Sequence, residues 1–251
     1  MPMPGLELDG RIALVTGGAG GIGRVICSDL AGLGATVVVA DLDPAACDAV
    51  AIDLPGAVGA AVDLMSEASI DACTDRVTSE VGAPTILVNC AALTGVERFL
   101  RTDRGWWDRQ WLVNLRAPMQ LTQNLLPGMI DAGWGRIVYV SSDGARAGSS
   151  GEAVYASGKG GLFGFAKSIA REFARHGVTS NVVCPGVTDT PNTRRHQAED
   201  PRVFEALTRL IPLKRLGEPE EVSAMISFLC TDRAGYTTGQ IVSVNGGIAM
   251  S

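Results

Sequence analysis

Two side chains one helical turn apart, Tyr155 and Lys159, have the types and the spacing for proton transfer. On a helix, residues four positions apart share a face, so the phenol and the ammonium can interact. A free tyrosine has a pKa of about 10, and a cation within a few ångströms favours the phenolate and lowers that pKa. We therefore expect Lys159 to bring Tyr155 towards the range of a general base near neutral pH. Such a pair alone is also typical of an ordinary surface helix, so the interpretation depends on the rest of the chain.

A glycine-rich segment follows the first β-branched run and precedes a helical pattern. It reads Thr16-Gly17-Gly18-Ala19-Gly20-Gly21-Ile22-Gly23. A strand, a glycine turn and a helix N-terminus form a diphosphate site, because the backbone approaches closely and amide N–H groups face the anion. Two glycine registers overlap, one with Gly18, Gly20 and Gly23 and the other with Gly17, Gly21 and Gly23. The alternative is a tight turn that only allows close helix packing.

A carboxylate, Asp41, ends the second β-branched run, 18 residues after Gly23. At that place an acid accepts hydrogen bonds from the adenosine ribose and repels a 2′-phosphate, which favours NAD over NADP. No Arg or Lys follows in Leu42-Asp43-Pro44 to bind a 2′-phosphate. Asp43 is a rival acid for this role, and an Asp that only opens a turn is the other interpretation.

The elements that must position these groups alternate between strand and helix patterns. Strands are expected at Ile12–Thr16, Thr36–Ala40, Val58–Val62, Ile86–Asn89, Arg136–Val140, Thr179–Val183 and Ile241–Val244. Helices are expected at about Ile22–Leu33, Glu67–Val81, Arg104–Asp131, Ala153–Arg175 and Glu220–Cys230. The pattern predicts one α/β domain over residues 1–251, with a seven-stranded, doubly wound parallel sheet and helices on both faces. Residues 188–218 contain no strand pattern, and we expect this long segment to be a substrate lid.

Composition excludes several classes of protein. The net charge of −6 and the lack of any basic run argue against a nucleic-acid partner, and no apolar stretch is long enough to span a membrane. Two histidines and six scattered cysteines without a CxxC pair argue against a metal site. Such cysteines are typical of buried, reduced thiols in a cytoplasmic protein.

Together these features resemble the short-chain dehydrogenase/reductase family over essentially the whole chain, which implies a Rossmann fold. The glycine segment resembles the family's TGxxxGxG loop and selects the register of Gly17, Gly21 and Gly23. Ser142 lies 13 residues before Tyr155, as the family's substrate-polarising Ser does, and Asn114 matches the Asn whose backbone holds a water of the proton relay. The resemblance assigns cofactor contacts to Gly17, Gly21, Ile22, Gly23, Asp41, Leu42, Asp63, Leu64, Asn89, Ala91, Tyr155, Lys159, Pro185, Gly186, Val187 and Thr190.

The resemblance implies an NAD-dependent alcohol dehydrogenase with Asn114, Ser142, Tyr155 and Lys159 as its catalytic residues. The family's NNAG segment departs here to Asn89-Cys90-Ala91-Ala92, which adds bulk where the backbone lines the cofactor. Cys90 as a nucleophile is the less favoured interpretation, because a buried thiol without a basic neighbour in sequence is unreactive.

Substrate and assembly are expectations from the same resemblance. Residues 142–155 and 175–186 resemble members that oxidise an alicyclic β-hydroxyacyl-CoA, and Arg146, Arg194 and Arg195 are candidates to meet its phosphates, with solvated arginines as the alternative. A reductase of 3-oxoacyl groups on acyl-carrier protein is the nearest rival, and a non-catalytic NAD sensor is a rival of another class. Family members commonly pair through the helix bearing Trp106, Trp107 and Trp111 and the one bearing Tyr155, so a homotetramer is expected.

Overall fold

The computed structural model describes residues 5–250, with every side chain in that range except those of residues 196 and 203. Strands and helices alternate through this range. Their order is β1 (Ile12–Thr16), α1 (Gly21–Gly32), β2 (Thr36–Asp41), α2 (Pro44–Ala51), β3 (Val58–Ala61), α3 (Glu67–Glu80), β4 (Ile86–Asn89), η1 (Phe99–Arg101), α4 (Arg104–Trp111), η2 (Leu112–Arg116), α5 (Ala117–Asp131), β5 (Gly135–Val140), α6 (Asp143–Ala147), α7 (Ala153–Phe173), η3 (Ala174–His176), β6 (Val178–Pro185), α8 (Pro191–Glu199), α9 (Pro201–Leu210), α10 (Pro219–Leu229), η4 (Asp232–Ala234) and β7 (Ile241–Val244).

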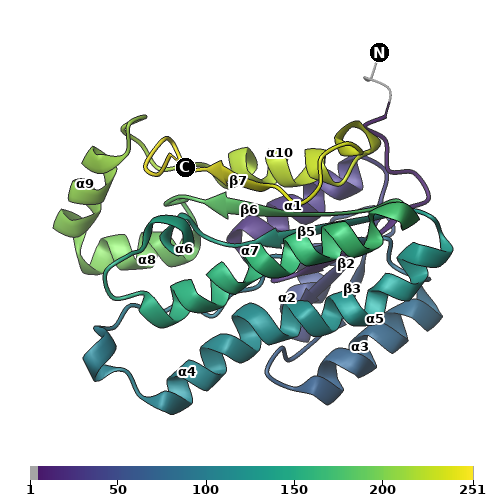
Figure 1. Cartoon of the computed structure of the whole chain (residues 1–251), viewed down its shortest axis with the longest axis horizontal. Helices are drawn as coiled ribbons and strands as arrows, with labels where there is room; N and C mark the ends of the chain where they lie inside the picture. Colours follow the sequence, from purple (N-terminus) through teal and green to yellow (C-terminus); the bar gives the residue numbers. More distant parts are fainter. Residues whose placement is uncertain (1–4, 251) are drawn as a thin grey trace.

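The seven strands form one parallel sheet in the order β3-β2-β1-β4-β5-β6-β7, which confirms the expected doubly wound sheet (Figure 1). The chain leaves β1 in one direction to β2 and β3, and returns beside β1 as β4. This reversal opens a crevice at the carboxyl ends of β1 and β4, where ligands bind in folds of this kind. The glycine segment, Asn89 and the end of β5 all lie at that edge.

Each face of the sheet is covered by helices, and each has its own apolar core. Because successive strand residues point to opposite faces, Ala13 and Val15 pack on one core and Leu14 on the other. Apolar residues of α1, α2 and α10 complete the first core. Those of α3, α5 and α7 complete the second, so α7 and its catalytic candidates rest directly on the sheet. Within residues 5–250, no helix has both the length and the apolarity needed to cross a membrane.

The structure differs from the sequence-based expectation in several details, two of which concern segments near the site. The stretch 104–131 is divided into α4, one π-helical turn (η2) and α5, rather than forming a single helix. Residues 188–218 contain no strand, as expected, but they include two helices, α8 and α9. The ends of this segment lie together, because Gly217 N–H donates to Val187 O at 3.0 Å and Asp189 N–H donates to Gly217 O at 2.8 Å.

Candidate active site

The glycine segment forms a tight backbone cradle between β1 and α1. Gly17 has a φ of +67°, and a β-carbon there would lie 2.8 Å from the Ala91 backbone. A β-carbon on Gly23 would lie 2.0 Å from Gly17 O, so no side chain fits at either position. Gly20, at the N-cap of α1, has no side chain to satisfy the first amides of the helix. The uncapped N-terminus of α1 therefore leaves amide N–H groups where a diphosphate would bind.

Asp41 ends β2 directly beside this cradle. Its Oδ2 accepts from Ala19 N–H at 3.1 Å and its Oδ1 accepts from Leu42 N–H at 2.7 Å, so the carboxylate is held against the glycine segment. The rival acid is used elsewhere: Asp43 caps α2 by accepting from Ala45 N–H at 3.0 Å. Of the two acids, Asp41 is the one placed to meet a ribose bound along the cradle.

Asn89, the last residue of β4, lies at the crevice between β1 and β4. Its side chain is 2% exposed, and neither its amide oxygen nor its amide nitrogen has a hydrogen-bond partner within the described residues. A buried amide without partners costs free energy, which a polar ligand group at this place would recover. The glycine cradle, the Asp41 carboxylate and this unused amide therefore fit a nicotinamide dinucleotide. Asp63 lies two residues after β3, with Oδ1 accepting from Met65 N–H at 2.9 Å, and Leu64 beside it is partly buried.

The segment from Pro185 to Thr190 closes the same edge of the sheet. Gly186 N–H donates to Val244 O at 3.0 Å, which ties the segment to β7. Thr190 reaches the cradle, because a β-carbon on Gly21 would lie 3.0 Å from Thr190 Cβ. Thr190 and Pro191 thus lie against the start of α1, where the nicotinamide end of a cofactor is expected.

Lys159 and Tyr155 project from α7 towards the carboxyl ends of β4 and β5. Lys159 is 2% exposed, and its Nζ donates to Val140 O at 2.8 Å and to Ala91 O at 3.4 Å. Burial lowers the pKa of Lys159 to about 8. Tyr155, 9% exposed, is brought to Ser142, whose hydrogen bond lowers the phenol pKa. The structure thus brings together three of the four expected catalytic side chains.

The expectation that Lys159 lowers the pKa of Tyr155 is wrong for this structure. Burial raises the pKa of the phenol, and the carboxylate of Glu152 raises it further. Lys159 does not offset this, because its ammonium is directed to the carbonyl oxygens of Val140 and Ala91. These surroundings favour the neutral form of the phenol. Glu152, three residues before Tyr155, was not expected to influence the site.

Asn114 lies in the π-helical turn and is fully buried. Its Oδ1 accepts from Leu93 N–H at 3.1 Å, and its Nδ2 donates to Leu93 O at 2.8 Å and to Gln110 Oε1 at 2.8 Å. The side chain therefore fixes the loop after β4, and only the backbone of Asn114 is available to a proton relay. Single π turns are frequent at functional sites, and this one faces α7, where a β-carbon on Gly158 would lie 3.2 Å from Asn114 Cβ.

A polar network that the sequence did not reveal holds the element that begins with Ser142. Ser142 caps α6, its Oγ accepting from Gly144 N–H at 3.1 Å. The next residue, Asp143, is 6% exposed and accepts through Oδ1 from Ser243 Oγ at 2.7 Å. Arg146 Nη1 donates to Ser243 Oγ at 3.1 Å and to Ile241 O at 3.0 Å. We call these contacts the α6–β7 network; they fix Ser142 relative to β7.

Two of the three arginine candidates have bonds within the chain, and the third, Arg195, is exposed. Arg146 belongs to the α6–β7 network, and Arg194 forms an ion pair with Asp189, with Nε 2.7 Å from Oδ1. The guanidinium groups of Arg146 and Arg194 therefore both contact other residues of the chain. Burial raises the pKa of the Cys90 thiol to about 11, which agrees with the expectation that it is not a nucleophile. All six cysteines are free thiols.

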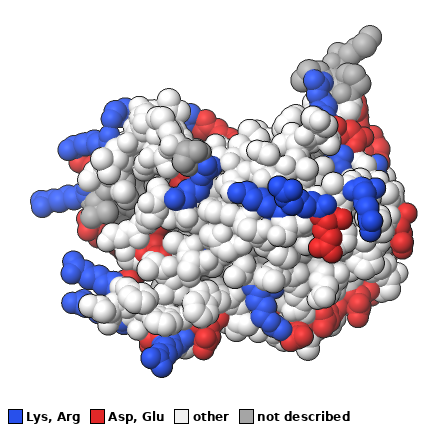
Figure 2. All heavy atoms as spheres, in the orientation of Figure 1, with Lys and Arg blue, Asp and Glu red and all other residues white. Residues whose placement is uncertain are grey.

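The surface beside the site is hollowed. Figure 2 shows a notch at the left edge, between the lobe that carries α8 and α9 and the lobe that carries α4 and the segment before it. Lys and Arg side chains project from both lobes. The helices α8 and α9 thus face the α4 region across this notch.

Comparisons with known proteins agree with this geometry. Residues 17–249 match a family model described as enoyl-(acyl carrier protein) reductase. The chain is 38% identical to the 3-oxoacyl-[acyl-carrier-protein] reductase FabG of Aquifex aeolicus, over 97% of this chain and 99% of that protein. It is 36% identical to the (3R)-3-hydroxyacyl-CoA dehydrogenase of Canis lupus familiaris, over 98% of both. A solved structure described as a putative gluconate dehydrogenase from Agrobacterium tumefaciens superposes with a TM-score of 0.93 at 27% identity, covering 98% of this chain and 99% of that one.

Proposed function

Because the chain belongs to the short-chain dehydrogenase/reductase family of oxidoreductases, which bind NAD or NADP, we propose that it is an NAD-dependent secondary-alcohol dehydrogenase. The observation that carries the proposal is the meeting of Ser142, Tyr155 and Lys159 at the crevice beside the glycine cradle. A non-catalytic NAD sensor would need neither the Ser142 hydroxyl nor the Tyr155 phenol. The dehydrogenase is therefore the better account of the site.

A bound nicotinamide would take up or supply the hydride, and the chain's own residues supply orientation and proton transfer. The proton of the substrate hydroxyl is transferred to or from Tyr155 Oη. The Ser142 hydroxyl forms a hydrogen bond with the same substrate oxygen. Lys159, whose Nζ lies between Val140 O and Ala91 O, would bind the nicotinamide ribose. The Asn114 backbone supports the path by which the proton leaves. Each step involves a buried group, so water competes little with the transfer.

The choice of NAD rests on Asp41. Its carboxylate lies against the cradle through Ala19 N–H, and a 2′-phosphate at that place would meet a negative charge. NAD is thereby favoured over NADP. A reductase of 3-oxoacyl-[acyl-carrier-protein], which usually draws on NADPH, is the second candidate, supported by the 38% identity to FabG.

The proposed substrate is an alicyclic or aliphatic β-hydroxyacyl-CoA. Support comes from the resemblance of residues 142–155 to 2-hydroxycyclohexanecarboxyl-CoA dehydrogenase and from a relative that acts on 3-hydroxyacyl-CoA. The dispersed, unlinked thiols support a reducing, cytoplasmic location.

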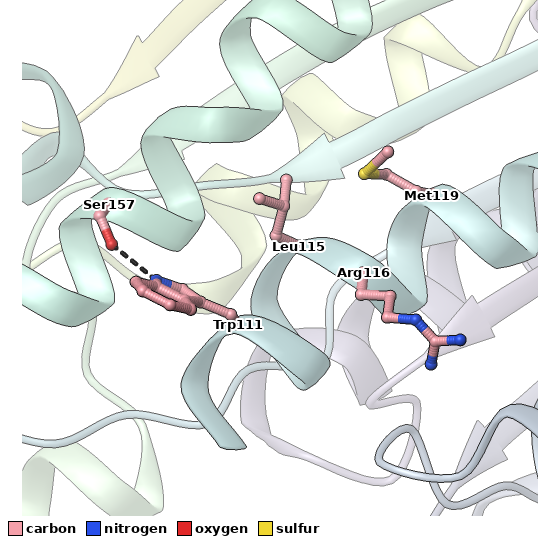
Figure 3. Close-up of a pocket in the computed structure, with 5 residues that line it drawn as sticks. All are labelled: Trp111, Leu115, Arg116, Met119 and Ser157. Carbon is pink, nitrogen blue, oxygen red and sulfur yellow. Dashed lines mark hydrogen bonds between the residues drawn. The ribbon is translucent and has the colours of Figure 1, made fainter. Parts of the chain in front are cut away.

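We also propose that the protein is a homotetramer. Trp111 and Met119 are each 42% exposed and border an apolar depression of about 400 Å³ on the outer side of α5 and α7. In Figure 3 the Trp111 ring lies against α7, where Nε1 donates to Ser157 Oγ at 2.9 Å. Apolar surface of this kind marks an interface, and a second copy of the chain is the proposed occupant. Light scattering should give four chains for the wild type and fewer for Trp111→Glu.

The test of function is a comparison of substrates and cofactors in one assay. Purified protein is supplied with NAD or NADP and a matched set of alcohols: β-hydroxyacyl-CoA, β-hydroxyacyl carrier protein and simple alicyclic alcohols. The appearance of reduced nicotinamide should be fastest with NAD and an acyl-CoA. Turnover of none of these alcohols with either cofactor would overturn the proposal.

A further inference from the structure

Glu152 faces the reacting groups although no step above uses it. It is the N-cap residue of α7, three positions before Tyr155, and is half-buried. That spacing directs both side chains to one side of the helix. Opposite lies α6, where a β-carbon on Gly144 would lie 2.8 Å from Glu152 Oε2 and 3.4 Å from Ser142 Oγ. The carboxylate and the Ser142 hydroxyl therefore border the same small volume, next to the Tyr155 phenol.

The charge of Glu152 has no local counterpart. Within the described residues, no hydrogen bond or ion pair reaches its carboxylate. The nearby cations have other partners: Lys159 Nζ donates to Val140 O and Ala91 O, and Arg146 belongs to the α6–β7 network. Four side chains influence the phenol, namely Glu152, Ser142, Cys90 and Cys184, and Glu152 is the only carboxylate among them. Its field reaches the reacting position, because it raises the pKa of Tyr155.

We propose that Glu152 is a specificity-determining residue that rejects substrates carrying a negative charge beside the reacting carbon. The inference rests on the proposed function. A β-hydroxyacyl thioester is neutral at the carbonyl group two bonds from its carbinol carbon, whereas the free β-hydroxy acid has a carboxylate there. With the substrate oxygen on Ser142 and Tyr155, that carboxylate would enter the volume that Glu152 borders. Repulsion between like charges a few ångströms apart near a protein surface corresponds to about 10- to 100-fold in binding.

The test is Glu152→Gln, which keeps the shape and removes the charge. The substrates are 3-hydroxybutyrate and its N-acetylcysteamine thioester, each with NAD. Glu97→Gln is the matched control, since Glu97 is exposed on the neighbouring loop and its Oε1 accepts only from Arg98 N–H. In Glu152→Gln, the ratio of kcat/KM for thioester over free acid should fall about 10- to 100-fold, and the control should keep the wild-type ratio.

A pH profile adds a readout that a structural role would not change. Loss of the carboxylate favours the phenolate, so the pH at which alcohol oxidation reaches half its maximum should fall in Glu152→Gln and stay constant in the control. The proposal would be overturned if Glu152→Gln changes kcat/KM equally for both substrates, or changes neither, and also leaves the pH profile unchanged.

A binding measurement distinguishes failure of this inference from failure of the proposed function. Calorimetric titration of the NAD-loaded protein with the free acid requires no turnover. If the wild type oxidises neither of these substrates nor any alcohol of the assay above, the proposed function fails, and tighter binding of the free acid by Glu152→Gln still supports the role of Glu152. If the wild type and Glu152→Gln bind the free acid equally, or if neither binds it measurably, the role of Glu152 is contradicted.

Discussion

Replacing Ser243 by alanine tests whether the α6–β7 network holds the Ser142 hydroxyl in its working position. Ser243 Oγ is the donor to Asp143 Oδ1 at 2.7 Å, and within the described residues Asp143 Oδ2 has no hydrogen-bond partner. The carboxylate is 6% exposed, so water cannot freely replace the lost hydroxyl. Leaving a buried charged group without its hydrogen bond costs about 1–3 kcal/mol.

We expect a loss of about 2 kcal/mol in the free energy of unfolding, which for a chain of this length lowers Tm by about 4–8 °C. Because Asp143 follows Ser142 directly, α6 should shift and kcat should fall by about 10- to 100-fold, with the affinity for NAD unchanged. The assays are thermal unfolding at one fixed protein concentration, since association also changes Tm, and steady-state turnover.

Ser168→Ala is the matched control for Ser243→Ala. Ser168 is exposed on α7, and its hydroxyl donates only to Gly164 O, at 3.1 Å. It should leave both Tm and kcat at the wild-type values. If Ser243→Ala behaves like this control in both assays, the network does not position Ser142 and the reasoning is refuted.

Three further predictions follow from cofactor choice, the lid and the buried lysine. Asp41→Ala should narrow the preference for NAD over NADP in kcat/KM, because it removes repulsion of the 2′-phosphate; a wild-type protein that uses NADPH as well as NADH contradicts this role. Hydrogen exchange in α8 and α9 should slow when cofactor and substrate bind together, and equal exchange in the free and ternary states counts against a lid. Burial lowers the pKa of Lys159 from 10.5 to about 8, so the unfolded chain binds more protons between these values. The wild type should therefore gain about 3 kcal/mol over Lys159→Met as pH rises from 7 to 10.5 in denaturant titrations, and parallel stabilities would contradict the assignment.

The sheet could be predicted from sequence because buried parallel strands have a continuous apolar pattern. The bounds of β4 and β7 match the expectation at both ends. The helix α2 was missed although its signal was present: Asp43 is an N-cap and Pro44 the first helical residue. An acid so close to Asp41 also fits a ribose ligand, and that interpretation conceals the cap. The π turn at Asn114 has no local signal, since the helical pattern continues through it.

The site was predicted in its parts but not in its electrostatics. Spacing along the chain and family resemblance located Ser142, Tyr155 and Lys159, and the structure brings them together. The raised pKa of Tyr155 depends on how deeply α7 packs against the sheet, which no residue spacing reveals. The contact between Asp143 and Ser243 joins residues 100 positions apart, so only the fold can show it.

Turnover by Tyr155→Phe tests the central claim most directly. The substitution removes the phenolic oxygen and keeps the ring that fills the site, so NAD should bind with unchanged affinity. Positioned acid–base catalysis contributes about 10²–10⁴-fold, and kcat for the best secondary alcohol should fall by that factor. A Tyr155→Phe protein that binds NAD normally and still oxidises the alcohol at the wild-type rate would show that the proton transfer does not pass through Tyr155.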